Sequence, residues 1–246
     1  MELGKLATEQ ANPLSQAIET LSVAEITQRM NQEDQGVPLA VRQSLPEINA
    51  FIEALVPVMA QGGRLFYMGA GTSGRLGLLD ASECPPTFGV SPNRVQGLIA
   101  GGLEAMSQAI EGAEDDQGAA VQDLVALKLS DKDALVGIAA SGRTPYVVAG
   151  LRYAQEQGAL TASLACVEAA EISRWADYPI EVLVGPEIIT GSSRLKAGTA
   201  QKLVLNMIST TAMIQLGKVY QGYMVDVQAT NQKLIDRAHR IIAATA

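Results

Sequence analysis

Along most of the chain, short apolar runs of four to seven residues alternate with longer segments rich in alanine and leucine. This alternation begins at Gly62 and is typical of strands that each lead into a helix. Strands are predicted at Arg64–Met68, Arg94–Ile99, Ala134–Ile138, Thr161–Leu164 and Ile180–Val184. Helices are predicted at Arg75–Glu83, Leu103–Ala113, Gln117–Leu127, Pro145–Gln157 and Arg194–Leu216. Because strands joined through helices pair in parallel, we expect an α/β fold, a three-layer α/β/α sandwich around a mainly parallel sheet.

Helices are also predicted before the first strand. Ser22 begins one, with Glu25 three residues on at the spacing of a capping box. A second is predicted over Ser44–Ala60. We therefore divide the chain into an N-terminal polar segment and helix at 1–43, which packs on the core, and a main domain at 44–246 that ends in long helices.

Three loops share a composition of glycine, hydroxyl side chains and one arginine. They lie at 69–75, 140–145 and 190–194. Each is predicted to lead into a helix, whose free N–H groups and partial positive charge attract phosphate or carboxylate. Since ligands of open α/β sheets bind beyond the carboxyl ends of the strands, these loops predict an anion site, although each alone also fits an ordinary capped turn. Their arginines either add positive potential or pair with acidic residues at a subunit boundary.

The first loop also fits a dinucleotide-binding pattern, Gly-x-Gly-x-x-Gly after a predicted strand. That fold expects an acidic residue about 20 positions on, and residues 84–103 contain no Asp or Glu. The sequence also contains no Gly-Lys-Ser or Gly-Lys-Thr, which a phosphate-binding loop of nucleotide hydrolases requires. We therefore expect no nucleotide cofactor.

Composition limits the chemistry further. The chain has 18 basic and 26 acidic residues, a net charge of −8, which argues against nucleic acid or an anionic membrane as partner. With one histidine, His239, and two cysteines, Cys84 and Cys166, a His-rich metal site and a disulfide framework are excluded, and no metal is expected. We find neither a run of about 18 apolar residues nor a secretory leader. A cytoplasmic location is therefore expected.

Proton transfer would then fall to carboxylates. Glu83 is predicted to end its helix because Pro85 and Pro86 follow it. The negative end of the helix dipole and apolar neighbours would favour its protonated form, which a general acid needs. A second acidic run, Glu111–Asp116, is either a shared proton-transfer site or a solvated helix end.

Six sequence runs, among them Asp80-Ala-Ser-Glu-Cys-Pro-Pro, carry a resemblance to a known family. They span 69–77, 79–87, 97–102, 111–115, 137–147 and 190–202. Together they resemble the N-acetylmuramic acid 6-phosphate etherases, from about Thr8 to the end of the chain. The resemblance implies a sugar isomerase (SIS) domain that binds a phosphosugar. It also implies a homodimer that works in peptidoglycan recycling without metal or nucleotide.

The resemblance also implies the reaction and its residues. The D-lactyl ether of N-acetylmuramate 6-phosphate would be cleaved to N-acetylglucosamine 6-phosphate and D-lactate, by elimination and addition of water. Glu83 would be the proton donor and Glu114 the second active-site glutamate. Phosphate contacts would come from hydroxyl side chains at Thr72, Ser73, Ser141, Thr144, Ser192 and Ser193.

Two other functions remain open, a non-catalytic phosphosugar-binding regulator and a phosphosugar aldose–ketose isomerase. Retention of both glutamates favours the lyase, because a regulator needs no acid and base. Etherases usually continue with a small helical domain, and the chain stops at Ala246, so we expect that tail to be absent.

Overall fold

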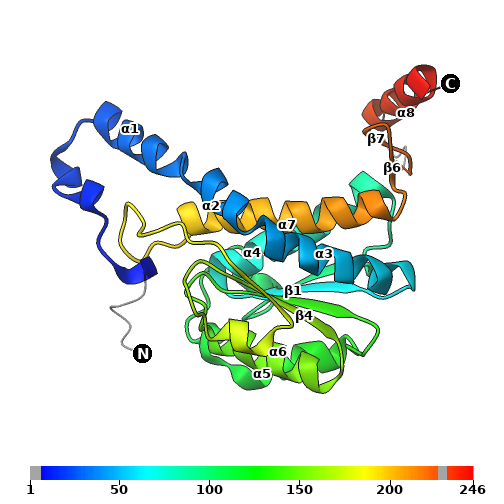
Figure 1. The fold of residues 1–246 in the computed structure, drawn as a ribbon, viewed down its shortest axis with the longest axis horizontal. Coiled ribbons are helices and arrows are strands. Elements are labelled where there is room, and N and C mark those ends of the chain that lie inside the picture. Colours follow the sequence, from blue (N-terminus) through cyan, green and yellow to red (C-terminus); the bar gives the residue numbers. More distant parts are fainter. Residues whose placement is uncertain (1–6, 227–231, 246) are drawn as a thin grey trace.

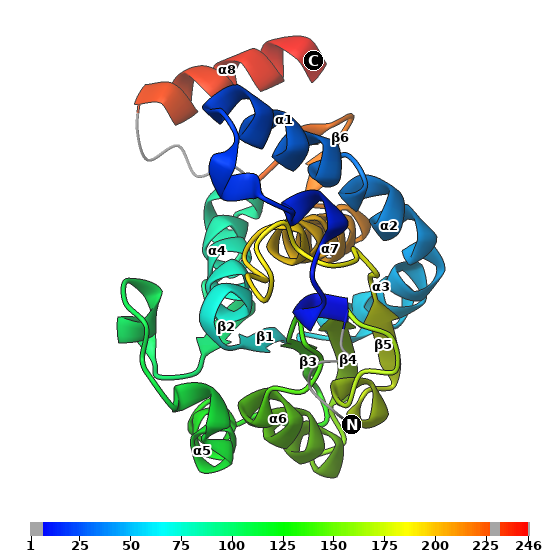
Figure 2. The same ribbon diagram turned by 90° about the vertical axis from the view of Figure 1, so that its left-hand side faces the viewer.

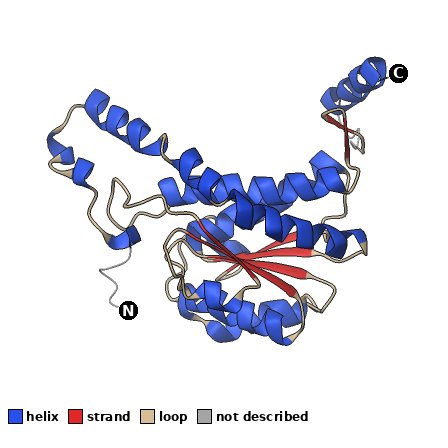
Figure 3. Cartoon of the chain, viewed as in Figure 1, coloured by secondary structure: helices blue, strands red, loops and turns tan. Residues whose placement is uncertain are grey.

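The computed structural model describes residues 7–226 and 232–245. Its centre is a five-stranded sheet in the order β2-β1-β3-β4-β5, in which all neighbouring strands are parallel. The strands are β1 (Leu65–Gly69), β2 (Val95–Ile99), β3 (Ala134–Ile138), β4 (Leu160–Ala165) and β5 (Tyr178–Glu181). All five predicted strands are therefore present. Helices cover both faces of the sheet, so the predicted three-layer α/β fold is confirmed (Figures 1 and 3).

The helices divide between the two faces. One face is covered by α2 (Val37–Gln43), α3 (Leu45–Ala60), α4 (Gly71–Phe88) and α7 (Lys196–Gln215). The other is covered by α5 (Gln117–Ala126), α6 (Pro145–Glu156) and the short helix η7 (Ile172–Trp175). α1 (Val23–Asp34) precedes this body, and the hairpin of β6 (Val219–Tyr220) and β7 (Tyr223–Met224) leads toward α8 (Gln232–Thr245). The short helices η2 to η6 are Ala7–Glu9, Pro13–Ser15, Ile18–Thr20, Leu103–Met106 and Ala113–Asp115.

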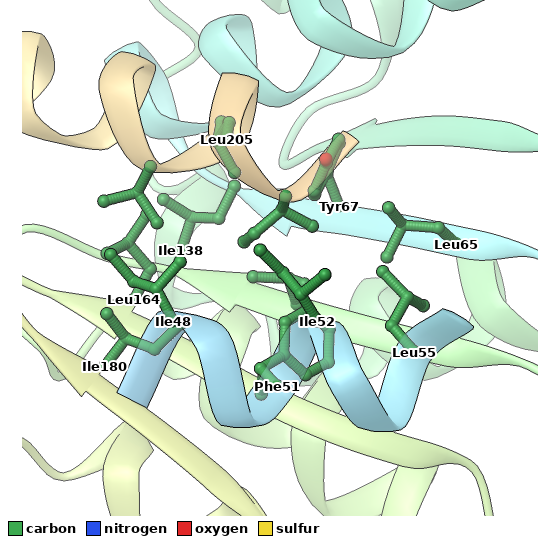
Figure 4. Packing of buried hydrophobic residues seen from close by; sticks show 14 of the residues in the cluster. Ile48, Phe51, Ile52, Leu55, Leu65, Tyr67, Ile138, Leu164, Ile180 and Leu205 are labelled. Carbon is green, nitrogen blue, oxygen red and sulfur yellow. The ribbon is translucent and has the colours of Figure 1, made fainter. Parts of the chain in front are cut away.

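Successive side chains along each strand point to opposite faces of the sheet, and they form two separate hydrophobic cores. In β1, Leu65 and Tyr67 face the α3 and α7 side, whereas Phe66 and Met68 face α5 and α6. Figure 4 shows the first core, in which Phe51 and its neighbours on α3 meet the strand side chains below α7. The central strands β1 and β3 are buried on both faces, which explains why they read as continuous apolar runs. The predicted burial of the long helix over Arg194–Leu216 is confirmed, since α7 lies between α3 and α4 (Figure 2).

The N-terminal helices begin where the sequence predicts. Ser22 caps α1 with a full capping box, because its Oγ accepts from Glu25 N and the Glu25 carboxylate accepts from Ser22 N at 2.9 Å. The predicted second helix is α3. The division between 1–43 and 44–246 stays a prediction.

One predicted helix, Leu103–Ala113, is wrong. The structure has the short helix η5 at its start and irregular chain up to η6. Arg75 explains much of the difference, because its Nε donates to the carbonyl oxygens of Ala105 at 3.0 Å and Met106 at 3.2 Å. These bonds attach the backbone of the segment to α4, where it follows an irregular path.

The predicted end of the helix over Arg75–Glu83 is also wrong. α4 continues beyond Glu83 through Pro85 and Pro86 and ends at Phe88, where Gly89 takes a left-handed conformation and its N–H donates to the Pro85 carbonyl. The prolines remove two donors from the last turn. Burial of the Phe88 side chain in the core holds that turn in place. Glu83 is therefore exposed on the side of a continuing helix, and neither the helix end nor the apolar surroundings expected for it are present.

Candidate functional site

The order of the strands creates a crevice at one edge of the sheet. From β1 the chain crosses to β2 on one side, and β3 then pairs on the other side of β1. The connections after β1 and β3 consequently leave toward opposite faces, into α4 and α6. Such a switch point, beyond the carboxyl ends of the strands, is where open α/β sheets bind ligands. The first two of the three predicted loops lie there.

The loop after β3 carries three polar side chains into a pocket. Ser141, Arg143 and Thr144 are half-buried and line a pocket of about 460 Å³. Gly142 between them has φ +70°, a conformation that favours glycine, and its carbonyl accepts from Ile172 N. Thr144 is the N-cap residue of α6 and makes no side-chain capping bond. Pro145 has no N–H and Val147 N donates to the Thr144 carbonyl, so of the first three residues of α6 only Tyr146 has a backbone N–H without a carbonyl partner in the described part of the chain. The loop combines hydroxyl donors, a guanidinium and a helix N-terminus, which together suit a phosphate group.

Glu114 lies in the same pocket. It sits on η6, between β2 and α5, and also lines a neighbouring pocket of about 320 Å³ beside Gly71. Glu114 is therefore placed between the loop after β1 and the loop after β3. The structure separates it from Asp116, whose carboxylate caps α5 by accepting from Ala119 N at 2.9 Å. At least one carboxylate of the acidic run therefore has a structural role. Composition alone could not show which one.

The loop after β1 is tightly folded, and its two hydroxyls differ. A Cβ at Gly69 would lie 2.7 Å from the backbone N of Gly74, so only glycine fits at the end of β1. Ser73 is buried, and its Oγ donates to Gln201 Oε1 at 3.0 Å, which ties α4 to α7. Thr72 is half-buried and more accessible. Of the two predicted phosphate ligands here, Ser73 thus already has a structural partner.

The third loop lies beside the first rather than beside Ser141. A Cβ at Gly198 would lie 3.3 Å from Thr72 Cγ2 and 3.6 Å from the carbonyl oxygen of Ser193, the neighbour of Ser192. The helix that follows, α7, does not offer a free N-terminus. The buried carboxylate of Glu187 accepts from the backbone N of the first two residues of α7, both at 2.9 Å. The expected anion site at this third helix end is therefore filled by the protein's own carboxylate.

Glu83 stands apart from this crevice. It follows Gly71 by twelve residues on α4, which at 1.5 Å per residue places it about 18 Å along the helix axis, toward the amino ends of the strands. Figure 1 shows α4 running away from the loops that surround the crevice. Within one chain, the two predicted glutamates are therefore not brought together.

One turn from Glu83, α4 carries a buried carboxylate that the sequence reasoning did not single out. Asp80 accepts from Asn206 Nδ2 at 2.6 Å and from Ser209 Oγ at 3.2 Å, both on α7. Burial raises the pKa of Asp80 above its ordinary value, against the lowering effect of these two hydrogen bonds. Asp80 therefore fixes the packing of α4 on α7, and through it the orientation of the surface that carries Glu83.

The pocket also contains a residue that sequence reasoning missed. Glu9, from the N-terminal short helix η2, lines it together with Glu171. Among residues 7–226 and 232–245, no group of three or more His, Cys, Asp and Glu side chains is arranged to hold a metal ion. None of the helices in the described parts of the chain is long and apolar enough to cross a membrane.

Comparison with known proteins assigns the family. Residues 47–155 match the glucokinase regulatory protein N-terminal SIS domain, and residues 113–211 match the SIS domain. The chain is 60% identical to an N-acetylmuramic acid 6-phosphate etherase of Geobacillus sp. (strain WCH70), over 98% of this chain and 81% of that protein. It is 62% identical to the one from Exiguobacterium sp. (strain ATCC BAA-1283 / AT1b), over 98% and 82%.

Solved structures agree on the fold. The protein c3406 of E. coli CFT073 superimposes with a TM-score of 0.58, over 82% of this chain and 96% of that one, at 15% identity. A phosphoheptose isomerase from Francisella tularensis gives 0.55, over 76% and 98%, at 17% identity. At such low identity these likenesses concern the fold alone. The sequence identity to the curated relatives goes further, and the chain belongs to the N-acetylmuramic acid 6-phosphate etherase family.

Proposed function

We propose that the chain is a carbon–oxygen lyase that releases D-lactate from N-acetylmuramate 6-phosphate. The names of its relatives at about 60% identity, over nearly the whole chain, support this activity. The sugar opens to its aldehyde, which acidifies the proton on C2. A carboxylate removes that proton, the C3–O bond breaks and lactate leaves with the electron pair and a proton. Water then adds across the C2–C3 double bond and gives N-acetylglucosamine 6-phosphate.

The phosphate end of the substrate is assigned to the loop after β3. Ser141 and Thr144 donate hydrogen bonds, and Arg143 supplies positive charge in a pocket that also holds acidic side chains. Thr72 contributes from the loop after β1. Ser192 and Ser193 stay candidates, since their loop lies against Thr72. This assignment uses the positive end of the α6 dipole and the Tyr146 N–H, and it leaves α7, capped by its own carboxylate, out of anion binding.

Glu114 is assigned to proton transfer at C2 and C3. The observation that carries the proposal is its position, since it lies in one pocket with Ser141 and Arg143 at the switch point of the sheet. A sugar phosphate held by that loop extends toward Glu114. A carboxylate within hydrogen-bond reach of a reacting carbon can act as general base or acid.

Glu83 acts in the same reaction only if a second subunit supplies it. In one chain it lies about 18 Å along α4 from the crevice, on an exposed helix surface. We therefore propose a homodimer in which Glu83 of one subunit faces Glu114 of the other. A two-fold axis would then create two such composite sites.

The first experiment measures D-lactate released from N-acetylmuramate 6-phosphate with a coupled lactate assay. Wild-type protein releases lactate, and Glu114→Gln reduces kcat at least 100-fold while leaving the affinity for N-acetylglucosamine 6-phosphate within a few-fold. Asp131→Asn, an exposed carboxylate at the opposite edge of the sheet, serves as control and keeps full activity. Sugar phosphate binding without any lactate release would instead favour a regulatory protein, and a ketose product would favour an isomerase.

A second experiment tests the composite site. Glu83→Gln and Glu114→Gln are each inactive alone, and are then mixed in equal amounts and allowed to exchange subunits. Half of the dimers become mixed, and each mixed dimer regains one intact site, so about a quarter of wild-type activity returns. Mixed dimers that regain no activity would show that the two glutamates do not act across subunits.

A further inference from the structure

The structure attaches the N-terminal segment to the loop that precedes α7. Asn12 is 5% exposed, and its Nδ2 donates to the Pro186 carbonyl at 2.9 Å and to Glu33 Oε2 at 2.6 Å. Gly191 N donates to the Thr8 carbonyl at 3.2 Å, and the Ser15 hydroxyl donates to the Ile188 carbonyl. Residues 8–15, which we call the strap, are thus held at three points by chain more than 170 positions away in sequence.

The strap crosses the carboxyl edge of the sheet. Figure 2, which views that edge, shows the dark-blue segment in front of the ends of the central strands, and Figure 1 places it on the same side. Its fixed path brings Glu9 into the 460 Å³ pocket beside Glu114 and Ser141. The Glu9 carboxylate also lies close to Gly191, because a Cβ added to Gly191 would be 3.4 Å from Glu9 Oε2. The strap therefore forms one wall of the candidate site.

Glu9 itself has no partner in the part of the chain that the structure describes. It makes neither a hydrogen bond nor an ion pair there, although Arg143 lines the same pocket. A segment anchored at three points thus presents an uncommitted carboxylate to a ligand pocket. Because the backbone of Glu9 is already held in place, less conformational entropy is lost when its side chain binds a ligand.

The charge around Glu9 limits what it can bind. Glu114, Asp115 and Glu171 line the pocket as well, against one arginine. A further carboxylate there repels a phosphate or a lactyl carboxylate, and it accepts hydrogen bonds only from neutral or cationic donors. On an amino sugar phosphate, those donors are the hydroxyl groups and the amide N–H.

We propose that Glu9 contacts the substrate, as acceptor for a sugar hydroxyl or the acetamido N–H, and that the strap holds it in place through Asn12. This inference rests on the proposed function for the identity of the sugar, and concerns a binding role distinct from proton transfer by Glu114. Glu9 would thereby select for a sugar phosphate over phosphate alone. Asn12 acts as a positioning residue.

The test compares Glu9→Gln with Glu19→Gln, an exposed glutamate of the same N-terminal region. Binding of N-acetylglucosamine 6-phosphate and of inorganic phosphate is measured by calorimetry. Glu9→Gln weakens the sugar phosphate about 10-fold and does not weaken inorganic phosphate, whose charge the Glu9 carboxylate repels, whereas Glu19→Gln changes neither. A sugar phosphate affinity within twofold of wild type in Glu9→Gln would overturn the proposal.

Asn12→Ala and the double variant test the strap. Asn12→Ala weakens the sugar phosphate like Glu9→Gln, and the double variant binds no more weakly than the weaker single variant, because both changes remove one contact. Losses that multiply in the double variant would contradict positioning through Asn12. These binding measurements need no turnover. Wild-type protein that binds the sugar phosphate without releasing lactate would therefore refute the lyase activity, while the role of Glu9 in binding would still be decided by the variants.

Discussion

An ion pair at the amino edge of the sheet joins the two strands whose other ends carry the site. Asp133, just before β3, is 2% exposed and accepts from Arg64, just before β1, through Nε at 2.9 Å, Nη2 at 2.7 Å and the backbone N at 3.1 Å. Asp133 also accepts hydrogen bonds from Ser130, from its backbone N at 3.0 Å and from its Oγ at 3.1 Å. Burial by itself would raise the pKa of Asp133, but these hydrogen bonds outweigh it and hold that pKa below its ordinary value.

Asp133→Asn replaces one accepting oxygen with an NH2 group that faces donors. Removing one partner of a buried pair costs about 3–5 kcal/mol, and since Arg64 is partly exposed we expect about 3 kcal/mol. For a protein of this size that corresponds to a fall in Tm of about 6–12 °C. Urea unfolding gives the free energy, with Asp131→Asn as the matched control, since that exposed carboxylate in the same loop should change stability by less than about 0.5 kcal/mol.

The pH dependence gives an independent check. A carboxyl whose pKa is lowered in the folded state stabilises the protein above its ordinary pKa, and this contribution is lost as the pH falls through the folded value. The difference in unfolding free energy between wild type and Asp133→Asn should therefore be constant near neutral pH and shrink below about pH 4. A loss under about 1 kcal/mol at neutral pH, or a difference that grows on acidification, would refute the reasoning.

Four further substitutions test the contacts of individual residues, and the first two compare serines with similar sequence surroundings. Ser73→Ala should cost about 1–3 kcal/mol in urea unfolding because it leaves the buried Gln201 oxygen unpaired, whereas Ser141→Ala should leave stability unchanged and weaken sugar phosphates more than unphosphorylated sugars in binding assays. Equal behaviour of the two variants in both measurements would contradict their assignment. Gly69→Ala should destabilise the protein strongly in thermal unfolding, since its Cβ would lie 2.7 Å from Gly74 N, and a normal Tm would show that the loop relaxes. Ser22→Ala should cost about 1 kcal/mol locally, seen as faster amide hydrogen exchange in the first turn of α1.

The strands were predictable because their signal is local. β1 and β3 are buried along their whole length, so their own residues are apolar whatever lies beside them, whereas the edge strands β2 and β5 are partly exposed. The helix predicted over Leu103–Ala113 failed because its conformation depends on Arg75, about thirty positions earlier, which holds its carbonyls. No pattern within the segment reports that contact.

At the site, residues with similar sequence surroundings make different contacts, which the sequence alone does not show. Ser73 and Ser141 each follow a strand and begin a Ser-Gly-Arg run, so they look equivalent in sequence, yet only Ser73 bonds to a buried glutamine on α7. The capped N-terminus of α7 depends on Glu187, which precedes it in irregular chain and carries no periodic signal. The strap is polar and reads as a loose segment, because its anchors are mostly backbone carbonyls of a distant loop.

Glu83 shows how a sequence motif can place a residue correctly on its element and still leave its role unresolved. It follows Gly71 of the glycine-rich loop by twelve residues, so in sequence it lies close to the anion site. A helix converts that short interval into about 18 Å, because each residue advances the axis by 1.5 Å. Two carboxylates that must meet one small sugar cannot therefore both come from one chain in this conformation. If both act in the reaction, the pairing is a property of the dimer, which is why recovery of activity in mixed dimers decides it and single-site variants alone do not.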